Sequence, residues 1–213
     1  MHVLYVYAHP EPRSFNGAIR DTAMTTLVRA GHEVKVSNLY VMKFKAVLDP
    51  HDFRIRYNSD RFDPAAEQVH GFRTGSLAPD ISEEIEKVSW ADLIIFQFPI
   101  WWSHMPAILK GWIDRVFVQG FAFDPESGNV YERGLLRGKK AMIVATFGSS
   151  EEKDSHGGTD RTLTDHISSI NHSVFEFTGM TALPPFIVFS TDTMNHEEGA
   201  RQIDRYRRFL ESL

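Results

Sequence analysis

Residues 96–117 read FQFPIWWSHMPAILKGWIDRVF, and the rest of the chain is organised around this stretch. The run Ala91–Phe98 is almost entirely apolar, which predicts a strand buried on both faces of a parallel sheet. Pro99 ends this strand because it lacks a ladder N–H, and Pro106 suits the first turn of a helix. Two adjacent tryptophans lie between the prolines, at the carboxyl end of a strand, where open α/β sheets bind ligands. We expect this turn to form one wall of a pocket for a flat cofactor.

The composition excludes several classes of protein. The chain has 213 residues and a formal net charge of −5, and it contains no cysteine. The absence of a long basic run disfavours a nucleic-acid partner, and the absence of cysteine rules out disulfide frameworks, thiolate zinc sites and cysteine nucleophiles. The N-terminus shows no signal-peptide pattern, and no apolar run approaches the ~20 residues that span a bilayer. We therefore expect a cytoplasmic protein whose residues 1–213 form one domain.

Strands and helices are expected to alternate along the chain. Residues 3–8 (VLYVYA) predict a buried strand, and a helix is expected from Phe15, with Ser14 as its N-cap. A strand over residues 33–39 completes a βαβ unit, which favours a parallel sheet. Two more strands and two more helices are expected after residue 117: strands at 139–147 and 186–190, helices at about 159–177 and 197–210. The predicted fold class is α/β, a doubly wound five-stranded parallel sheet with helices on both faces.

Residues 40–80, approximately, interrupt this alternation. They include HDFRIRYNSDRFDP (51–64), which mixes charges, aromatics and prolines without a clear period. A connection of this length is usually functional or disordered, and its aromatics argue against disorder. We expect an ordered excursion, with short helices near 65–70 and 81–89, that packs on a neighbour or covers a site.

Three loops should meet at the carboxyl edge of this sheet: residues 9–16, 99–104 and 146–158. The first contains neither GxGxxG nor a P-loop motif, which disfavours a dinucleotide-binding Rossmann fold and a P-loop NTPase. Ser14, Asn16 and the N–H groups of a helix N-terminus make a phosphate site there, although Ser14 could serve only as a cap. His9 is either structural or a contact to a phosphate or cofactor.

The other two loops contain residues suited to a flat ring system. Trp101 and Trp102 are either core residues or stacking walls, and two adjacent rings in a turn cannot easily both point inward. Gly148, Ser149 and Ser150 offer N–H groups for the edge of a cofactor. His156 is either a proton donor or a solvated loop residue. A flavin, with its phosphate, fits these parts better than a nicotinamide alone.

Three segments carry a resemblance to a known family: YAHPEPRSFNGA, FQFPIWWSHMPAILKGWIDRVFVQGFAF, and the closing TGM followed by LPPF. They resemble the flavodoxin-like NAD(P)H:quinone oxidoreductases, and the likeness covers nearly the whole chain. The resemblance implies a flavodoxin-like fold and a homodimer with two flavin sites at its interface. It also implies a ping-pong, two-electron transfer from NAD(P)H through the flavin to quinones, with azo or nitro compounds as further acceptors.

The resemblance leaves two other functions open. Some relatives look like ancillary subunits of potassium efflux systems, in which binding to a membrane transporter is the main role. A one-electron flavodoxin-type carrier is disfavoured by the aromatic acceptor pocket and the missing flavodoxin phosphate loop. FAD is the expected cofactor, because longer relatives with this type of excursion bind FAD, and FMN is the alternative.

Site residues follow from the resemblance position by position. The pyrophosphate and ribityl contacts correspond to His9, Ser14, Phe15, Asn16 and Ala18. The loops along the isoalloxazine correspond to Pro99, Ile100, Trp101, Trp102 and Ser103, and to Thr146, Phe147, Gly148 and Ser149. Phe123 corresponds to an aromatic that lines the acceptor pocket from the partner subunit, and His156 to a proton-relaying histidine.

The sequence departs from the family pattern in the last of these loops. The family commonly has TTGG where residues 146–149 read TFGS, and a tyrosine expected a few residues later is absent. Hydride transfer needs no protein acid or base, because the flavin itself carries the electrons. These changes should therefore alter acceptor preference more than the reduction itself.

Overall fold

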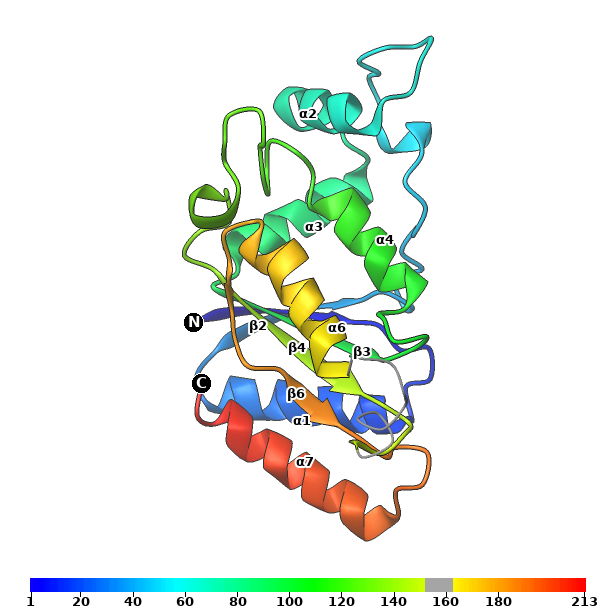
Figure 1. Cartoon of the computed structure of the whole chain (residues 1–213), viewed down its shortest axis with the longest axis vertical. Coiled ribbons are helices and arrows are strands. Elements are labelled where there is room, and N and C mark those ends of the chain that lie inside the picture. Colours follow the sequence, from blue (N-terminus) through cyan, green and yellow to red (C-terminus); the bar gives the residue numbers. More distant parts are fainter. Residues whose placement is uncertain (152–162) are drawn as a thin grey trace.

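The computed structural model describes residues 1–151 and 163–213, and its centre is a parallel β-sheet (Figure 1). The strand order is β2-β1-β3-β4, with β5 and β6 both paired to β4. The α/β class and the parallel doubly wound sheet are thus confirmed. The strands are β1 (His2–Tyr7), β2 (Glu33–Asn38), β3 (Leu93–Pro99), β4 (Lys140–Thr146), β5 (Thr181–Ala182) and β6 (Phe186–Val188).

The edge beside β4 differs from the single strand expected there. β5 pairs with Lys140 and Ala141, and β6 pairs with residues 144–146. Pro184 and Pro185 lie between the two short strands and have no N–H to donate, so the ladder is interrupted at this point. The fifth position of the sheet is therefore occupied by two short strands, β5 and β6.

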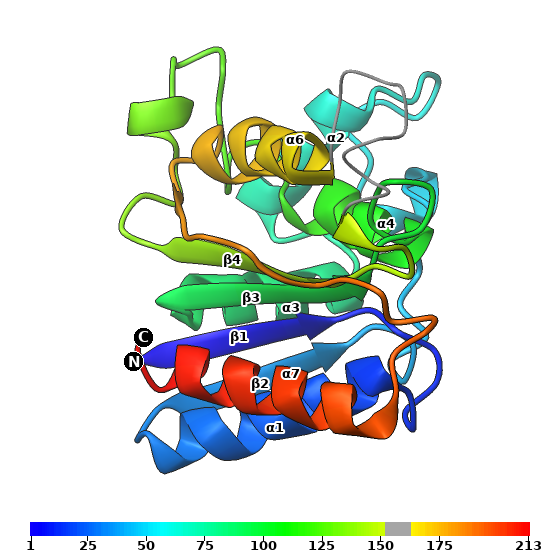
Figure 2. The same cartoon turned by 60° about the horizontal axis from the view of Figure 1, so that its bottom comes forward.

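Helices cover both faces of the sheet, as Figure 2 shows. One face carries α1 (Phe15–Arg29) and α7 (His196–Leu210), and the other carries α3 (Pro79–Trp90), α4 (Ala107–Val116) and α6 (Leu163–Ile170). A π-helical turn, η3 (Asn171–Glu176), continues α6. Alternate residues of the strands divide between the two layers, so that Tyr5 packs towards α1 and α7 while Phe96 packs towards α4.

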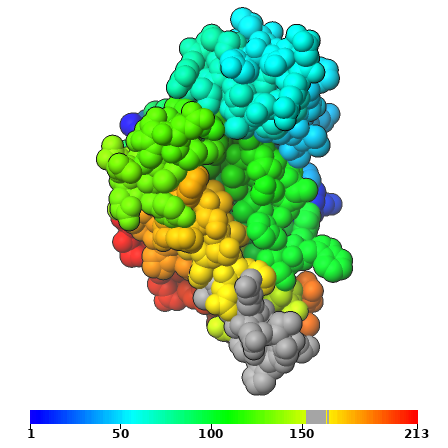
Figure 3. Space-filling model, turned by 45° about the horizontal axis from the view of Figure 1, so that its top comes forward, coloured from blue at the N-terminus to red at the C-terminus, as the bar shows by residue number. Residues whose placement is uncertain are grey.

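The excursion after β2 is ordered and projects from one end of the molecule, in cyan in Figure 3. It contains the short 3₁₀ helix η1 (Pro50–Asp52) and α2 (Pro64–Thr74). Arg115 of α4 anchors it through two hydrogen bonds of 3.0 and 2.8 Å to the buried carboxylate of Asp52. A charge-assisted bidentate pair is among the stronger polar contacts in proteins, so the excursion is fixed to the core beside α4.

The loop after α4 leads through a short 3₁₀ helix, η2 (Tyr131–Arg133), back to β4. Across the two described ranges, no helix combines the length and apolarity needed to cross a membrane.

Candidate functional site

Thr146, the last residue of β4, ties together two loops at the carboxyl edge of the sheet. Its hydroxyl oxygen accepts a hydrogen bond of 2.8 Å from the Asn16 side-chain amide, and its carbonyl accepts one of 2.8 Å from the N–H of Ile100. Thr146 and Asn16 are 3% and 6% exposed. The loop after β1, the loop after β3 and the end of β4 therefore meet at one residue.

The loop after β1 ends in a well-formed helix N-terminus. Ser14 caps α1, since its hydroxyl accepts a hydrogen bond of 3.1 Å from the N–H of Gly17. The same hydroxyl donates to the Glu11 carbonyl at 2.7 Å and lies 3.0 Å from His9 Nδ1. Within the described residues, the N–H groups of Phe15 and Asn16 meet no acceptor. Free N–H groups at the positive end of a helix dipole form an anion site.

The tryptophan turn is a tight two-residue hairpin. The backbone groups of Trp101 and His104 exchange hydrogen bonds of 2.9 and 3.0 Å, and Trp102 and Ser103 between them have φ of +51° and +59°. The left-handed region is costly for non-glycine residues, by about 1–3 kcal/mol each, and such residues cluster at functional sites. The turn therefore holds its two central residues in a strained backbone.

The two tryptophans are exposed to different degrees. Trp101 is 43% exposed, and its ring centroid lies 6.4 Å from that of His9. The Trp102 side chain is fully exposed. Trp101 therefore lies beside the loop after β1, and Trp102 is exposed to solvent in the single chain.

The segment after β4 packs against the segment after β6. Phe147 donates its N–H to the Val188 carbonyl at 2.8 Å, and Ser149 accepts from the N–H of Ser190 at 2.9 Å. A Cβ at Gly148 would lie 2.3 Å from the Asp192 carboxylate, so a side chain there would force that carboxylate to move. This glycine therefore permits a close approach of the two segments. His156, the expected proton donor, lies outside the described residues.

Phe123 lies away from these loops in its own chain, beyond the far end of α4. Its ring centroid is 5.3 Å from that of Phe177, and both line a cavity of about 440 Å³ with Phe117 and Val174. Phe177 was not predicted from the sequence as a site residue, although it lines the same cavity as Phe123.

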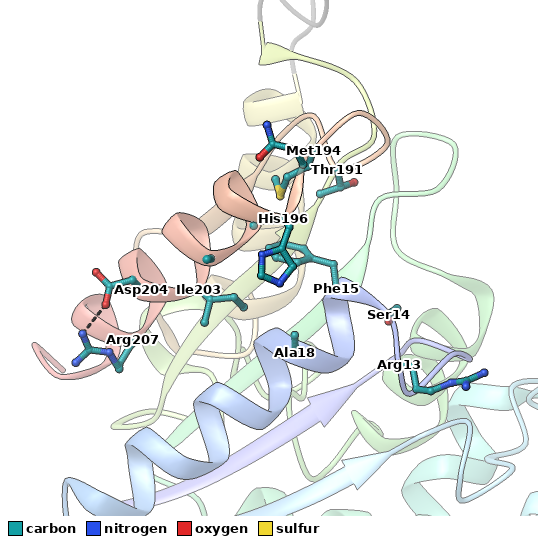
Figure 4. Close-up of a pocket in the computed structure, with 13 residues that line it drawn as sticks. Arg13, Ser14, Phe15, Ala18, Thr191, Met194, His196, Ile203, Asp204 and Arg207 are labelled. Carbon is teal, nitrogen blue, oxygen red and sulfur yellow. Dashed lines mark hydrogen bonds and ion pairs between the residues drawn. The ribbon is translucent and has the colours of Figure 1, made fainter.

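A second, larger cavity opens between the first turns of α1 and α7 (Figure 4). It has a volume of about 540 Å³ and includes Ser14, Phe15 and Ala18 of the predicted phosphate site. Its other wall was not predicted from the sequence. That wall comes from the loop after β6 and from α7: Thr191, Met194, Asn195, His196, Gly199, Ala200, Ile203, Asp204 and Arg207. Their place after the last strand, at the same edge of the sheet, is the signal that could have found them.

Comparisons with known proteins agree with this arrangement. A family model described as flavodoxin-like fold matches residues 1–211. Human ribosyldihydronicotinamide dehydrogenase [quinone] is 38% identical over 99% of this chain and 91% of its own length. The chain belongs to the flavodoxin-like NAD(P)H:quinone oxidoreductase family. The resemblance drawn from the sequence is thereby confirmed.

Other members of this family have closely similar sequences and folds. A ribosyldihydronicotinamide dehydrogenase-like protein, traD, of Penicillium crustosum is 39% identical over 99% of this chain and 81% of its own. A crystal structure from Klebsiella pneumoniae, described as a candidate quinone reductase, superposes with a TM-score of 0.94 at 40% identity. It covers 100% of this chain and 84% of that chain. The fold and the sequence likeness thus extend over essentially the whole chain.

Proposed function

We propose that this protein is a flavin-dependent oxidoreductase that transfers two electrons from NAD(P)H to quinones by a ping-pong course. The observation that carries the proposal is the meeting of the two loops and β4 at Thr146, with a helix N-terminus on one side and Trp101 on the other. When bound, a flavin supplies the hydride and electron chemistry. The chain itself has to bind the flavin, orient it and admit each substrate in turn.

The phosphate end of the cofactor is assigned to the start of α1. The free N–H groups of Phe15 and Asn16 would bind phosphate oxygens, and the helix dipole favours the negative charge. Ser14 holds this turn in place through its bonds to Gly17 and Glu11. The residues present therefore fit a phosphate-bearing flavin.

The cavity between α1 and α7 supports FAD over FMN. It is continuous with Ser14 and Phe15, so a group attached beyond the first phosphate would enter it directly (Figure 4). Its volume of about 540 Å³ is within the range of small-molecule sites. Phe15, Met194 and Ile203 supply apolar surface for a planar base, and Asn195 and Arg207 supply polar groups.

The assembly we propose is a homodimer with a flavin site at each end of its interface. Trp102 is fully exposed in the single chain, and Phe123 and Phe177 line an apolar cavity remote from Trp101. A fully exposed tryptophan and a partly exposed pair of phenylalanines are typical of interaction surfaces. In this arrangement Phe123 of one subunit lines the acceptor pocket of the other, and Trp101, Ser103 and residues 146–149 line it from the first.

Steady-state kinetics test the proposal. We expect the purified protein to oxidise NAD(P)H in the presence of 1,4-benzoquinone, with parallel lines in double-reciprocal plots, because each substrate reacts in its own half-reaction. Intersecting lines would argue against the ping-pong course. A flavin-loaded protein with no turnover would argue against the enzyme.

A further inference from the structure

One chain of buried side-chain hydrogen bonds crosses the layer between the sheet and α7. The hydroxyl groups of Tyr206 and Tyr5 lie 3.1 Å apart, and Tyr5 bonds Gln97 Oε1 at 2.7 Å. Gln97 Nε2 contacts the Asn16 carbonyl at 2.7 Å and Asn16 Oδ1 at 3.2 Å, and Asn16 then bonds Thr146 at 2.8 Å. Tyr5, Gln97 and Tyr206 are completely buried among apolar side chains. A buried polar chain of this kind stabilises only if each member is satisfied.

The donor and acceptor of every hydrogen bond in this series follow from one group, the backbone carbonyl of Asn16. The backbone carbonyl of Asn16 can only accept, so the atom of Gln97 that faces it is the nitrogen, Nε2. Gln97 Oε1 then faces Tyr5, which must donate its single hydroxyl hydrogen, and Tyr206 must in turn donate to Tyr5. Burial raises the pKa of both tyrosines, so both hydroxyls keep their protons.

The bond directions are fixed as far as Thr146 at the carboxyl edge of the sheet. Because Gln97 Nε2 donates to the Asn16 side chain, the Asn16 atom beside it is Oδ1, and Nδ2 faces Thr146. Thr146 Oγ1 therefore accepts from Asn16. The Thr146 carbonyl is already bonded to Ile100, so the hydroxyl hydrogen is the one group of this residue with no acceptor within the described residues.

We propose that Gln97 is a positioning residue which, through Asn16, fixes the Thr146 hydroxyl as a hydrogen-bond donor to an acceptor atom of the bound flavin. The acceptor is a carbonyl oxygen or an unprotonated ring nitrogen. The inference rests on the proposed flavin function. Gln97 lies on β3, two residues before the loop that starts at Pro99, and its side chain points into the buried layer beside α1 and α7. It acts on the flavin only through Asn16, by fixing the orientation of the Asn16 side-chain amide.

Loss of Gln97 has a specific consequence. The oxygen and nitrogen of an asparagine amide are nearly the same size, so without the Gln97 donor the Asn16 amide can turn over. Asn16 Oδ1 then accepts a hydrogen bond from the Thr146 hydroxyl. The Thr146 hydroxyl has no hydrogen left for the flavin, and only its oxygen lone pairs face the flavin acceptor atom. The contact between Thr146 Oγ1 and the flavin acceptor atom changes from a hydrogen bond to a repulsion between two acceptors.

The test is a double-mutant cycle on two observables, the Kd of the apoprotein for FAD and the midpoint potential of the bound flavin. Gln97→Met keeps the length of the side chain and removes its hydrogen bonds. We expect it to weaken FAD binding about fivefold, the worth of one neutral hydrogen bond. We also expect a lower midpoint potential, because a donor stabilises the electron-rich reduced flavin. In a Thr146→Val background, Gln97→Met should have no further effect on either observable.

Tyr206→Phe is the matched control. It removes a buried hydroxyl from the far end of the same chain and leaves the Tyr5–Gln97 and Gln97–Asn16 bonds in place. It should lower stability slightly and leave the Kd and the potential at wild-type values. Gln97→Leu is a second variant in case Gln97→Met does not fold, and its effect should also vanish in the Thr146→Val background.

The outcomes separate the two proposals. An equal effect of Gln97→Met with and without Thr146 would overturn the positioning role, as would wild-type values in both Gln97→Met and Gln97→Leu. Equal losses of FAD affinity in Gln97→Met and Tyr206→Phe would show that Gln97 contributes only to the stability of the fold, and would also overturn the positioning role. Failure of the proposed function would appear differently, as a wild-type apoprotein that binds no flavin.

Discussion

The Asn16 side chain donates to the Thr146 hydroxyl at 2.8 Å, and these two residues are 130 positions apart in the chain. This bond joins the first turn of α1 to the end of β4, and so joins the candidate phosphate site to the candidate ring site. Both partners are buried, so the loss of one leaves the other without a partner away from water.

Replacement of Asn16 tests this link. We expect Asn16→Ala to lower the free energy of unfolding by about 2 kcal/mol and to weaken flavin binding at least about tenfold, because a buried bond and the positioning of Thr146 are both lost. Flavin content per chain and urea unfolding measure the two effects. Thr26→Ala is the control, since Thr26 is another buried polar residue of α1 and lies outside the site. Equal flavin loss in both variants would contradict the assignment.

The exposed ring of Trp102 can be separated from its strained backbone. Trp102→Gly removes the ring and relieves the positive φ, and Lys43→Gly relieves a similar φ of +50° elsewhere. We expect both to keep or raise the thermal midpoint, since glycine adopts this conformation at no steric cost. Only Trp102→Gly should weaken the dimer or raise the KM for a quinone. Unchanged dimerisation and KM in Trp102→Gly would count against a role at the interface.

The ion pair that anchors the excursion predicts a pH dependence of stability. Burial opposes ionisation of Asp52, but its hydrogen bonds to Arg115 and Lys45 outweigh this and lower its pKa. A carboxyl group with a lowered folded-state pKa stabilises the fold at pH values above its unfolded pKa of about 3.9. That stabilisation is lost as the pH falls through the folded-state pKa.

Asp52→Asn should therefore cost roughly 3 kcal/mol of unfolding free energy at pH 7, because it leaves buried Arg115 short of a partner. The difference from wild type should shrink as the pH falls below about 3.9, measured by urea unfolding across a pH series. Asp21→Asn, at an exposed carboxylate that pairs with Arg20, should change little at any pH. A constant difference for Asp52→Asn over the whole series would show that the ionised form contributes nothing.

Gly199 gives a test of FAD against FMN. A Cβ at this position meets Phe15 at 3.6 Å and Met194 at 3.7 Å, so a larger side chain would enter the cavity between α1 and α7. We expect Gly199→Leu to weaken FAD binding about tenfold or more while FMN binding stays near the wild-type value. Gly199→Ala makes only ordinary contacts and should bind FAD normally. Parallel losses for FAD and FMN in Gly199→Leu would place the adenine group elsewhere.

Local sequence signals were sufficient for most of the fold. The apolar runs of β1, β3 and β4 and the N-cap Ser14 were read correctly because each depends on neighbours in the chain. The break at Pro184 and Pro185 could also have been read from the sequence, since proline cannot join a ladder.

Contacts between distant residues could not be predicted in the same way. The bond from Arg115 to Asp52 spans 63 positions and depends on how the excursion folds back onto α4. The wall contributed by α7 was missed because only the closed sheet brings Ile203 opposite Phe15. The full exposure of Trp102 was equally unreadable, since it follows from the two positive φ angles of the turn.

The most direct test of the central claim is the identity and stoichiometry of the flavin in the purified protein. Absorption and mass spectra should show FAD at about one molecule per chain, or full reconstitution of the apoprotein by FAD, and dithionite should bleach the bound flavin. A colourless protein that takes up neither FAD nor FMN at high concentration would contradict the account.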